Sequence, residues 1–431
     1  KKVIRPKIIS KYEKKAEKIL KLIYKKLRSK KDILSIKLEK ILIGDLLYDT
    51  YLKSNQIATI DIKNEKFYNT LNDFIHLYFY WKDYFNNNKV HSIIGVHSVY
   101  SYGLPLRIAI SKKIKAYTIK SSEVSKITKK HLFSSTNFFD YPKKFKSLKK
   151  TKKVKALALA EKIIKNRTSG LGGISNHMVS KISSFHSRKT KAIIKKGKKI
   201  KILICTRNVF DATHVFGNLL FSDNYEWLEF LGKISKKTNY DWYIKLHPDY
   251  LDGTKEVIDS FLDKYKNIKF IENNYSHNQL LKEGIDVALT CFGSIAHEYP
   301  LFNRLVINCS LNNPHINYNF SLHPKNKLEY QKILLNLKKI NKPINKREVY
   351  EFYSMFTILK KSWLINDFKS LISRYGVKII FDTRFYSYWT NEEFSLNKHN
   401  FILKSISDFL KTNDYLMNWN TKDVNNFFKK C

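Results

Sequence analysis

The feature that most constrains the fold is a regular alternation of strand and helix patterns between residues 201 and 309. Each strand pattern is a short apolar run, and each is followed by an amphipathic helix pattern. The predicted strands are 201–205, 242–246, 268–271, 286–291 and 305–309, and the predicted helices are 224–237, 254–266, 277–283 and 294–302. Such alternation predicts a parallel sheet with helices on both faces, which is a Rossmann-like domain.

The first half of the chain shows a less regular version of the same alternation. Its predicted strands are 40–44, 92–96 and 115–119, and its predicted helices lie within 7–40, 70–85 and 103–111. We therefore expect an α/β fold with two Rossmann-like domains that face a central cleft, and a helical C-terminal extension. The expected domains are residues 1–195, residues 196–330 and the helical region 331–431.

Composition narrows the class of protein. Hydrophobic residues make up 43% of the chain and aromatic residues 14%, which is enough for packed cores. No stretch reaches the roughly 18 consecutive apolar residues of a membrane-spanning helix. The opening residues do not have the pattern of a signal peptide, so we expect a cytoplasmic protein. The four cysteines form no CxxC pair, and we expect buried thiols and no metal site.

The chain is strongly basic, with a formal net charge of +43. Residues 141–201 contain 20 Lys and Arg and one acidic residue, Glu161. This charge has two explanations: a partner with dense negative charge, or a compositional bias toward Lys, Asn and Ile. The sequence lacks RNA-binding and zinc-finger patterns, and Lys predominates over Arg. An anionic membrane surface therefore fits better than nucleic acid, and we expect no nucleic-acid partner.

Two motifs follow predicted strands of the second domain and predict a phosphate site. His247 and Pro248 follow the strand 242–246, and Gly293 and Ser294 stand between the strand 286–291 and the next helix. A hydroxyl, an imidazole and free N–H groups at a helix start are phosphate ligands. Glu298 lies one helical turn after Ser294, where it can accept hydrogen bonds from ribose hydroxyls. The structural alternatives are a turn at His247 and helix capping by Ser294.

The loop after the first strand of the second domain faces the same edge of the predicted sheet. It carries Arg207, Asp211 and His214. Arg207 and His214 are candidates for phosphate binding, and Asp211 is a candidate base or orienting group. The structural alternative is a polar loop with an Asx turn.

Three residues of the first domain are candidates for a general base that takes the proton from a hydroxyl group. Asp49 is the preferred base and His97, which follows the strand 92–96, is the alternative. Asp45 lies one turn before Asp49, and capping of the helix is its simpler explanation.

These motifs together resemble a known family. The relevant residues are Gly44 to Tyr51, His97 with Tyr100 and Arg107, Phe210-Asp211 with His214, His247-Pro248, and Gly293-Ser294 with Glu298. Over roughly residues 40–330 the chain is similar to HP-motif glycosyltransferases of the GT-B fold from bacterial capsule and lipopolysaccharide biosynthesis, such as Kdo and sialic-acid transferases. It is more distantly similar to glycerophosphotransferases of teichoic-acid synthesis. The acidic base motif of the sialyltransferases is absent from this sequence.

The resemblance implies an N-terminal acceptor domain, a C-terminal nucleotide-donor domain and work at the inner membrane face. We expect a metal-independent enzyme without a cofactor, which moves a sugar from a CMP- or UDP-type donor to a glycan or lipid-linked acceptor. Two alternatives stay open. One is a non-hydrolysing nucleotide-sugar epimerase, and the other is a basic nucleic-acid-binding protein.

Overall fold

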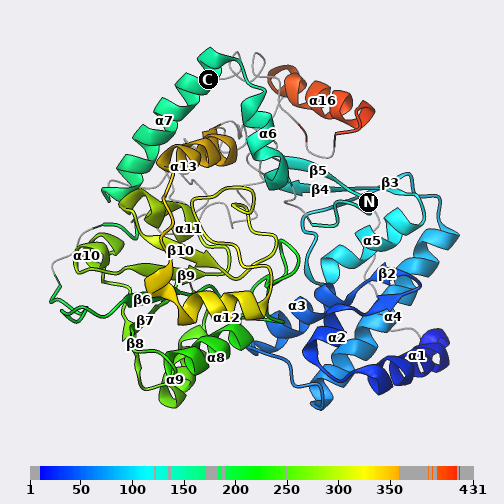
Figure 1. The fold of residues 1–431 in the computed structure, drawn as a ribbon. Helices are drawn as coiled ribbons and strands as arrows, with labels where there is room; N and C mark the ends of the chain where they lie inside the picture. The colour runs from blue at the N-terminus through cyan, green and yellow to red at the C-terminus, as the bar shows by residue number, and fades with distance from the viewer. Residues whose placement is uncertain are drawn as a thin grey trace. The chain divides into compact units, whose positions relative to one another are not determined.

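The structure is a computed structural model, which Figure 1 draws as a ribbon. Contacts between its residues divide the chain into two units. The described residues are 10–120, 123–133, 137–170, 183–186, 190–248, 250–358 and 396–414, together with residues 387, 391 and 417. Unit 1 comprises Lys1–Trp81, Val99–Ser101 and Ser135–Leu359, and unit 2 comprises Lys82–Ser98, Tyr102–Ser134 and Lys360–Cys431. The limits of these units do not coincide with the expected domain boundaries after residues 195 and 330.

Unit 1 contains a five-stranded parallel sheet with the strand order β10-β9-β6-β7-β8. Its strands are β6 (Lys201–Cys205), β7 (Asp241–Lys245), β8 (Ile268–Ile271), β9 (Val287–Thr290) and β10 (Leu305–Asn308). The connecting helices are α8 (Asn224–Ser235), α9 (Thr254–Lys264), α10 (His277–Lys282) and α11 (Ile295–Glu298), followed by the 3-10 helix η4 (Tyr299–Phe302). The predicted alternation over residues 201–309 is confirmed, with element ends within two residues of the prediction.

The strand order creates a switch point next to β6. The chain passes from β6 to β7 and β8 on one side, and then returns to β9 and β10 on the other side. Loops that leave β6 and β9 therefore diverge at the carboxyl edge of the sheet. In open α/β sheets this is the place where ligands bind.

Apolar side chains from both faces of the sheet hold this part of the molecule together. Ile202 and Ile204 of β6 lie in one core, whereas Leu203 lies in the other, as the period of two in a strand requires. The first core also contains Trp227, Leu228, Leu231, Trp242 and Ile244, and the second contains Tyr243, Ala288, Ile295 and Tyr299. Each fully buried large apolar side chain stabilises the fold by about 1.5–3 kcal/mol. Burial on both faces explains why the strands are nearly continuous apolar runs.

The N-terminal part of unit 1 is mostly helical. It contains η1 (Ser10–Tyr12), α1 (Glu13–Lys26), α2 (Lys30–Leu34), β1 (Lys37–Leu38), β2 (Ile41–Leu42), α3 (Gly44–Asn55) and α4 (Glu65–Asn87), which continues into unit 2. The prediction that strand 40–44 belongs to a Rossmann-like sheet is wrong. Its residues form only β2, which pairs antiparallel with β1. Glu39 and Lys40 have positive φ angles of 47° and 74°, so the chain reverses there in a tight hairpin.

The remaining elements of unit 1 come from the middle of the chain and from beyond the sheet. They are η3 (Asn137–Asp140), α6 (Tyr141–Lys146), α7 (Lys150–Thr168), α12 (Lys327–Leu335), η5 (Leu337–Lys339), α13 (Lys346–Tyr353) and the π-helix η6 (Ser354–Ile358). Helices α6, α7 and α13 share one core, which includes Phe145, Ile164 and Phe352. Within the expected helical region 331–431, the described residues contain the end of α12, η5, α13, η6 and the helix Leu396–Lys411, and most of residues 359–431 lie outside the described residues.

Unit 2 contains a three-stranded sheet of β3 (Ser92–Gly95), β4 (Lys115–Lys120) and β5 (Glu123–Ile127). Strands β3 and β4 are parallel, whereas β4 and β5 are antiparallel. The 3-10 helix η2 (Tyr100–Tyr102) and α5 (Gly103–Ser111) connect β3 to β4, and α16 (Leu396–Lys411) also belongs to this unit. The predicted strands 92–96 and 115–119 and the predicted helix 103–111 are confirmed. The antiparallel β5 makes this sheet different from the expected all-parallel Rossmann pattern.

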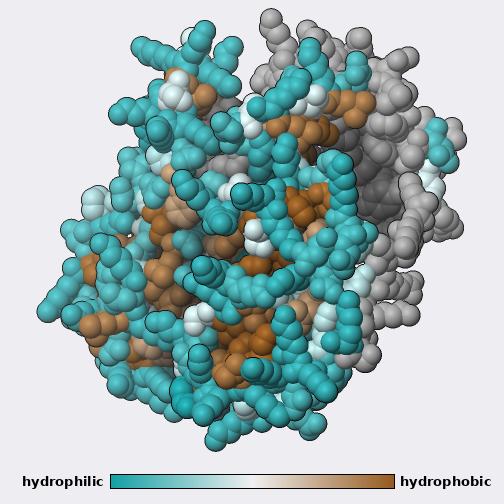
Figure 2. All heavy atoms as spheres, turned by 90° about the vertical axis from the view of Figure 1, so that its right-hand side faces the viewer, coloured by the Kyte–Doolittle hydropathy of each residue, from teal (hydrophilic) through white to brown (hydrophobic). Residues whose placement is uncertain are grey.

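The surface is largely hydrophilic, as the lysine-rich composition requires. Figure 2 shows hydrophilic side chains over much of the viewed face, with apolar side chains gathered between them. Among the described residues, no helix has the combination of length and apolar composition that crossing a bilayer requires.

Candidate functional site

Three loops that carry predicted donor residues leave the sheet of unit 1 at the same edge. Arg207 follows β6, His247 follows β7, and the Gly293-Ser294 pair follows β9. The strands are parallel and β6 lies between β7 and β9. Neighbouring strands are about 4.8 Å apart, so these loops start one or two strand spacings from each other. The three loops therefore begin at the same edge of the sheet, on the strands at and beside its switch point.

Ser294 stands at the start of α11, but its side chain makes no capping hydrogen bond. The alternative explanation, in which Ser294 caps this helix, is therefore wrong. Gly293 has a steric role, because its N–H donates to Thr290 Oγ1 at 3.1 Å and a Cβ atom would lie 2.8 Å from that oxygen. Helix α11 has only four residues, so its dipole contributes little. The half-buried Ser294 hydroxyl is the group that this loop offers to a ligand.

Arg207 carries a guanidinium group with one donor atom that no described residue engages. It stacks over the Phe292 ring, with 4.1 Å between the guanidinium carbon and the ring centroid. Its Nη1 atom is buried and has no hydrogen-bond partner. Burial lowers the pKa of this guanidinium from its usual value. An unpaired buried donor is costly, and an anion at this position would remove that cost.

His247 is half-buried and Pro248 is exposed in the loop after β7. Lys245, the last residue of β7, is 3% exposed, and its Nζ donates to the Glu272 carbonyl at 2.9 Å. His277 lies nearby, and burial together with the charge of Lys245 lowers its pKa to about 3. The charge of Lys245 therefore lies two residues before His247 in the chain, and His277 is uncharged at neutral pH.

Asp49 and His214 form a fully buried pair, with each residue about 1% exposed. His214 Nδ1 lies 2.7 Å from Asp49 Oδ1, and the His214 N–H donates to Asp49 Oδ2 at 3.0 Å. His214 Nε2 lies 3.0 Å from the Ser222 carbonyl, so both ring nitrogens act as donors in the charged imidazolium form. Burial alone would lower the pKa of His214, but the Asp49 carboxylate raises it overall. Both oxygens of Asp49 are therefore engaged in holding His214.

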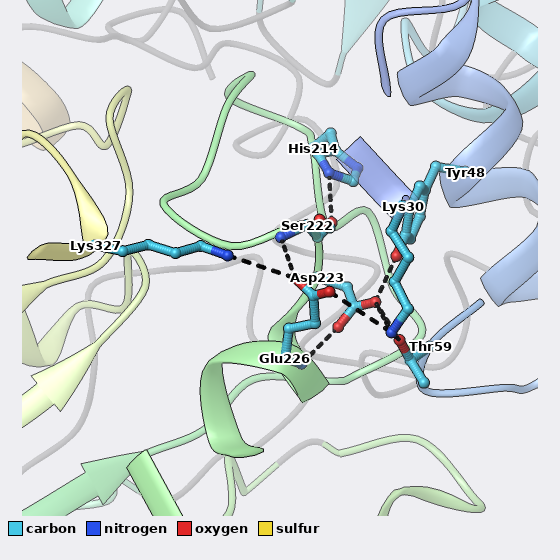
Figure 3. A network of polar contacts seen from close by, with 8 residues as sticks. All are labelled: Lys30, Tyr48, Thr59, His214, Ser222, Asp223, Glu226 and Lys327. Carbon is cyan, nitrogen blue, oxygen red and sulfur yellow. Dashed lines mark hydrogen bonds and ion pairs between the residues drawn. The ribbon is translucent and has the colours of Figure 1, made fainter. Parts of the chain in front are cut away.

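A second buried carboxylate extends this contact between the N-terminal helices and the sheet (Figure 3). Asp223 is 0% exposed and caps α8 by accepting from the Glu226 N–H at 2.7 Å. Its Oδ2 also accepts from the Tyr48 and Thr59 hydroxyls, each at 2.5 Å. Lys30 Nζ lies 4.0 Å from the same oxygen. Helix α3 is thus fastened to the loop before α8 by two buried carboxylates.

Asp211 differs from Asp49 because only one of its oxygens is engaged. Its Oδ1 accepts from Lys53 at 3.0 Å and from the Tyr100 hydroxyl at 2.7 Å. No described residue gives a hydrogen bond to Oδ2, and the side chain is 35% exposed. Burial would raise the pKa of Asp211, but the contacts with Tyr100 and Lys53 lower it overall. Tyr100 has a φ angle of 55°, a conformation that is uncommon for residues other than glycine.

Glu298 is buried at the end of α11, where it pairs with Arg167 from the last turn of α7. Arg167 Nε donates to Glu298 Oε1 at 2.5 Å. The side chains are 10% and 2% exposed, respectively. Burial would raise the pKa of Glu298, but the charge of Arg167 outweighs burial and the pKa is lowered. Glu298 is therefore a buried anion next to the switch point.

The other two candidate bases lie in different surroundings. Asp45 is 8% exposed in the first turn of α3, where Ile43 rather than Asp45 is the capping residue. Its expected role as a helix cap is therefore wrong. His97 follows β3 and is half-buried in unit 2. In the described part of the chain, no cluster of three or more His, Cys, Asp or Glu residues could hold a metal ion.

The sequence patterns missed several residues that build this site. Arg167, Lys53, Lys245 and Asp223 were not identified. Asp223 had a detectable signal, since Asp-x-x-Glu before a helix predicts a capping residue. Arg167 had none, because its partner is 131 residues away in the chain. Pairing across such a separation is fixed by the tertiary fold rather than by local sequence.

Comparisons with known proteins give only distant structural similarity. No family model matches the chain, and no curated protein matches its sequence. The similar solved structures include the β-Kdo 2,4 transferase KpsC of Thermosulfurimonas dismutans, with a TM-score of 0.36 and 12% identity over 62% of this chain and 78% of that chain. They also include a UDP-GlcNAc 2-epimerase of Neisseria meningitidis bound to UDP-GlcNAc, with a TM-score of 0.27 and 13% identity over 67% of this chain and 81% of that chain. The UDP-GlcNAc 2-epimerase of Methanocaldococcus jannaschii has a TM-score of 0.28 and 14% identity over 65% of this chain and 79% of that chain.

Proposed function

We propose that this protein is a glycosyltransferase, which moves a sugar from a nucleotide-activated donor to a glycan or lipid-linked acceptor of a surface polysaccharide. The observation that carries the proposal is that Arg207 and Ser294 stand in the loops after β6 and β9, beside the switch point of the sheet. Among the described residues, Arg207 Nη1 has no hydrogen-bond partner, and the Ser294 side chain makes no capping bond. Both are phosphate ligands, and they follow neighbouring strands. His247, from the third loop, would complete the phosphate site.

In the proposed reaction, the bond between the anomeric carbon and the donor phosphate breaks as the acceptor oxygen bonds to that carbon. Negative charge develops on the leaving phosphate, and Arg207, Ser294 and His247 would stabilise it there. Glu298 would accept hydrogen bonds from the ribose of the nucleotide. We expect no metal ion and no cofactor in this reaction, and a CMP- or UDP-type donor.

We assign the general base to Asp211, which has a free carboxylate oxygen, whereas both oxygens of Asp49 hold His214. Asp211 would take the proton from the acceptor hydroxyl as the new bond forms. Asp49, with Asp45 beside it on α3, would instead position the loop that carries Asp211 and His214. His97 stays the alternative base.

The exposed face of α7 supports a location at an anionic membrane surface. It presents Lys155, Lys162 and Lys165, together with the exposed apolar residues Val154 and Leu159. Lysines attract anionic lipid headgroups, and exposed apolar side chains gain free energy by leaving water at the membrane interface. We propose that α7 holds a cytoplasmic enzyme at the inner membrane face. Binding to an anionic membrane accounts for the positive charge of α7, so we propose no nucleic-acid partner.

A nucleotide screen and a transfer assay test the function together. The screen measures the melting temperature with CMP, UDP, GDP and CDP, because a ligand of the folded state raises it. The transfer assay then uses the sugar donor of the best nucleotide, with and without membrane extract as the source of acceptor. We expect nucleotide release only with acceptor, and about 100-fold slower release by His247→Ala. Conversion of the donor without acceptor would indicate an epimerase, and stabilisation by none of the nucleotides would reject the proposal.

A further inference from the structure

We propose that Arg167 is a positioning residue, which holds one oxygen of Glu298 and leaves the other oxygen to recognise the ribose diol of the nucleotide. This inference rests on the proposed function, because it concerns the nucleotide of the same donor. It adds a residue from α7 to a site that otherwise comes from the loops of the sheet. It also names the ribose diol as the part of the nucleotide whose binding depends on Arg167.

The two carboxylate oxygens of Glu298 differ in their contacts with the protein. Arg167 Nε donates to Oε1 at 2.5 Å. Oε2 receives no hydrogen bond from any described residue. Glu298 lies one helical turn after Ser294, and the Glu298 N–H donates to the Ser294 carbonyl at 3.2 Å. The open carboxylate oxygen is therefore one turn away from the hydroxyl that we assign to the donor phosphate.

Arg167 is fixed in place by its own helix. The buried face of α7 consists of Ala156, Ala160, Ile164 and Arg167, at the spacing of successive helical turns. The last turn of α7 is attached to α10, because Asn278 Nδ2 donates to the Thr168 carbonyl at 2.7 Å. Ser183 Oγ donates to the Arg167 carbonyl at 2.9 Å. The guanidinium is thus anchored on a rigid element, as a positioning group requires.

Arg167 also keeps Glu298 ionised. Burial by itself would raise the pKa of this carboxyl, and the positive charge of Arg167 outweighs that effect. The ionised carboxylate accepts hydrogen bonds at both oxygens and donates none, whereas a protonated carboxyl group carries an O–H donor and is a weaker acceptor. The other titratable groups that act on Glu298 or respond to its charge are His277, His297, Cys205 and Tyr299. Burial lowers the pKa of His277 to about 3 and that of His297 to about 4, and it raises that of Cys205 to about 12 and that of Tyr299 above its usual value. None of these groups changes its charge between pH 6 and pH 8.5.

The experiment compares a ribonucleotide with its 2′,3′-dideoxy counterpart. The probe is the nucleotide that most stabilises the wild-type protein, and both affinities are measured by calorimetry at pH 6 and pH 8.5. A single hydrogen bond to a charged group corresponds to about 10- to 150-fold tighter binding of the ribonucleotide. We expect this ratio in the wild-type protein at both pH values. We expect Arg167→Met to reduce it to about one at pH 6 and to recover part of it at pH 8.5, where more of the carboxyl is ionised.

Matched variants separate positioning from general damage. Arg167→Lys keeps the charge and should keep most of the ratio, and Glu298→Gln should lose the ratio at both pH values. The double variant Arg167→Met/Glu298→Gln leaves no unpaired buried charge, and should bind both nucleotides as Glu298→Gln does. Affinity for the dideoxy nucleotide should be similar in all variants. An unchanged ratio in Arg167→Met, or in the Glu298→Gln protein, would overturn this inference while the proposed function stands. Failure of the wild-type protein to bind any nucleotide would instead reject the proposed function.

Discussion

At the scale of single residues, the surroundings of Asp49 and Asp211 suit these two carboxylates to different roles. Asp49 suits a structural anchor, and Asp211 suits a general base. Asp49 is buried and uses both oxygens on His214. Asp211 is partly exposed, and Lys53 and Tyr100 occupy only its Oδ1. A base needs an oxygen that a substrate can reach, whereas a structural anchor needs none. The sequence does not reveal this difference in burial and hydrogen bonding, and from the sequence alone Asp49 is the preferred base.

The two aspartates should therefore respond differently to the same substitution. We expect Asp211→Asn to lower kcat by about 10²- to 10⁴-fold while nucleotide affinity and melting temperature change little. We expect Asp49→Asn to destabilise the protein by about 3–5 kcal/mol, because it leaves a buried imidazolium without its counter-charge. Transfer kinetics and urea unfolding measure the two effects. A stable but inactive Asp49→Asn protein beside an active Asp211→Asn protein would return the base role to Asp49.

At the scale of elements, α3 is attached to the sheet-containing part of unit 1 through buried polar contacts (Figure 3). The Asp49–His214 pair forms one contact, and Asp223 with Tyr48 and Thr59 forms the other. These contacts join residues 164 to 175 positions apart. The sequence predicted most helices and strands, because their signals are local patterns of apolar residues. It could not predict these pairings, because they depend on how distant elements meet.

The attachment should depend on pH in a defined direction. The folded-state pKa of His214 is raised above 6.5. Its contribution to stability is therefore fully present below pH 6.5, and it is lost as the pH rises through the folded-state pKa. We expect the difference in melting temperature between wild type and His214→Asn to be larger at pH 6 than at pH 9.5. The Asp49→Asn background serves as control, and in it the stabilisation at pH 6 should disappear, because burial alone lowers the pKa of His214. A difference that grows with pH would contradict the ion pair.

At the scale of the whole molecule, the sequence predicted one Rossmann-like domain well and the other poorly. The strands of unit 1 are buried on both faces, so each is a clear apolar run with a helix after it. In unit 2 the sheet has three strands, and β5 is antiparallel. Helix-strand alternation predicts parallel strands and therefore cannot reveal β5, which pairs antiparallel with the strand directly before it in the chain. The N-terminal helices also differ from the expectation of one N-terminal domain over residues 1–195, since residues 1–81 belong to unit 1 together with the five-stranded sheet.

The central claim is that the switch point of this sheet binds phosphate, and one titration tests it most directly. The affinity of the wild-type protein for the best-binding nucleotide is compared with its affinity for the matching nucleoside, and both are then measured for Arg207→Gln and Ser294→Ala. We predict that the nucleotide binds at least about 10-fold more tightly than the nucleoside, because charge-assisted hydrogen bonds contribute about 1.5–3 kcal/mol each. We also predict that each substitution weakens nucleotide binding and leaves nucleoside binding unchanged. Equal affinities in the wild-type protein, or nucleotide binding that neither substitution alters, would contradict the account.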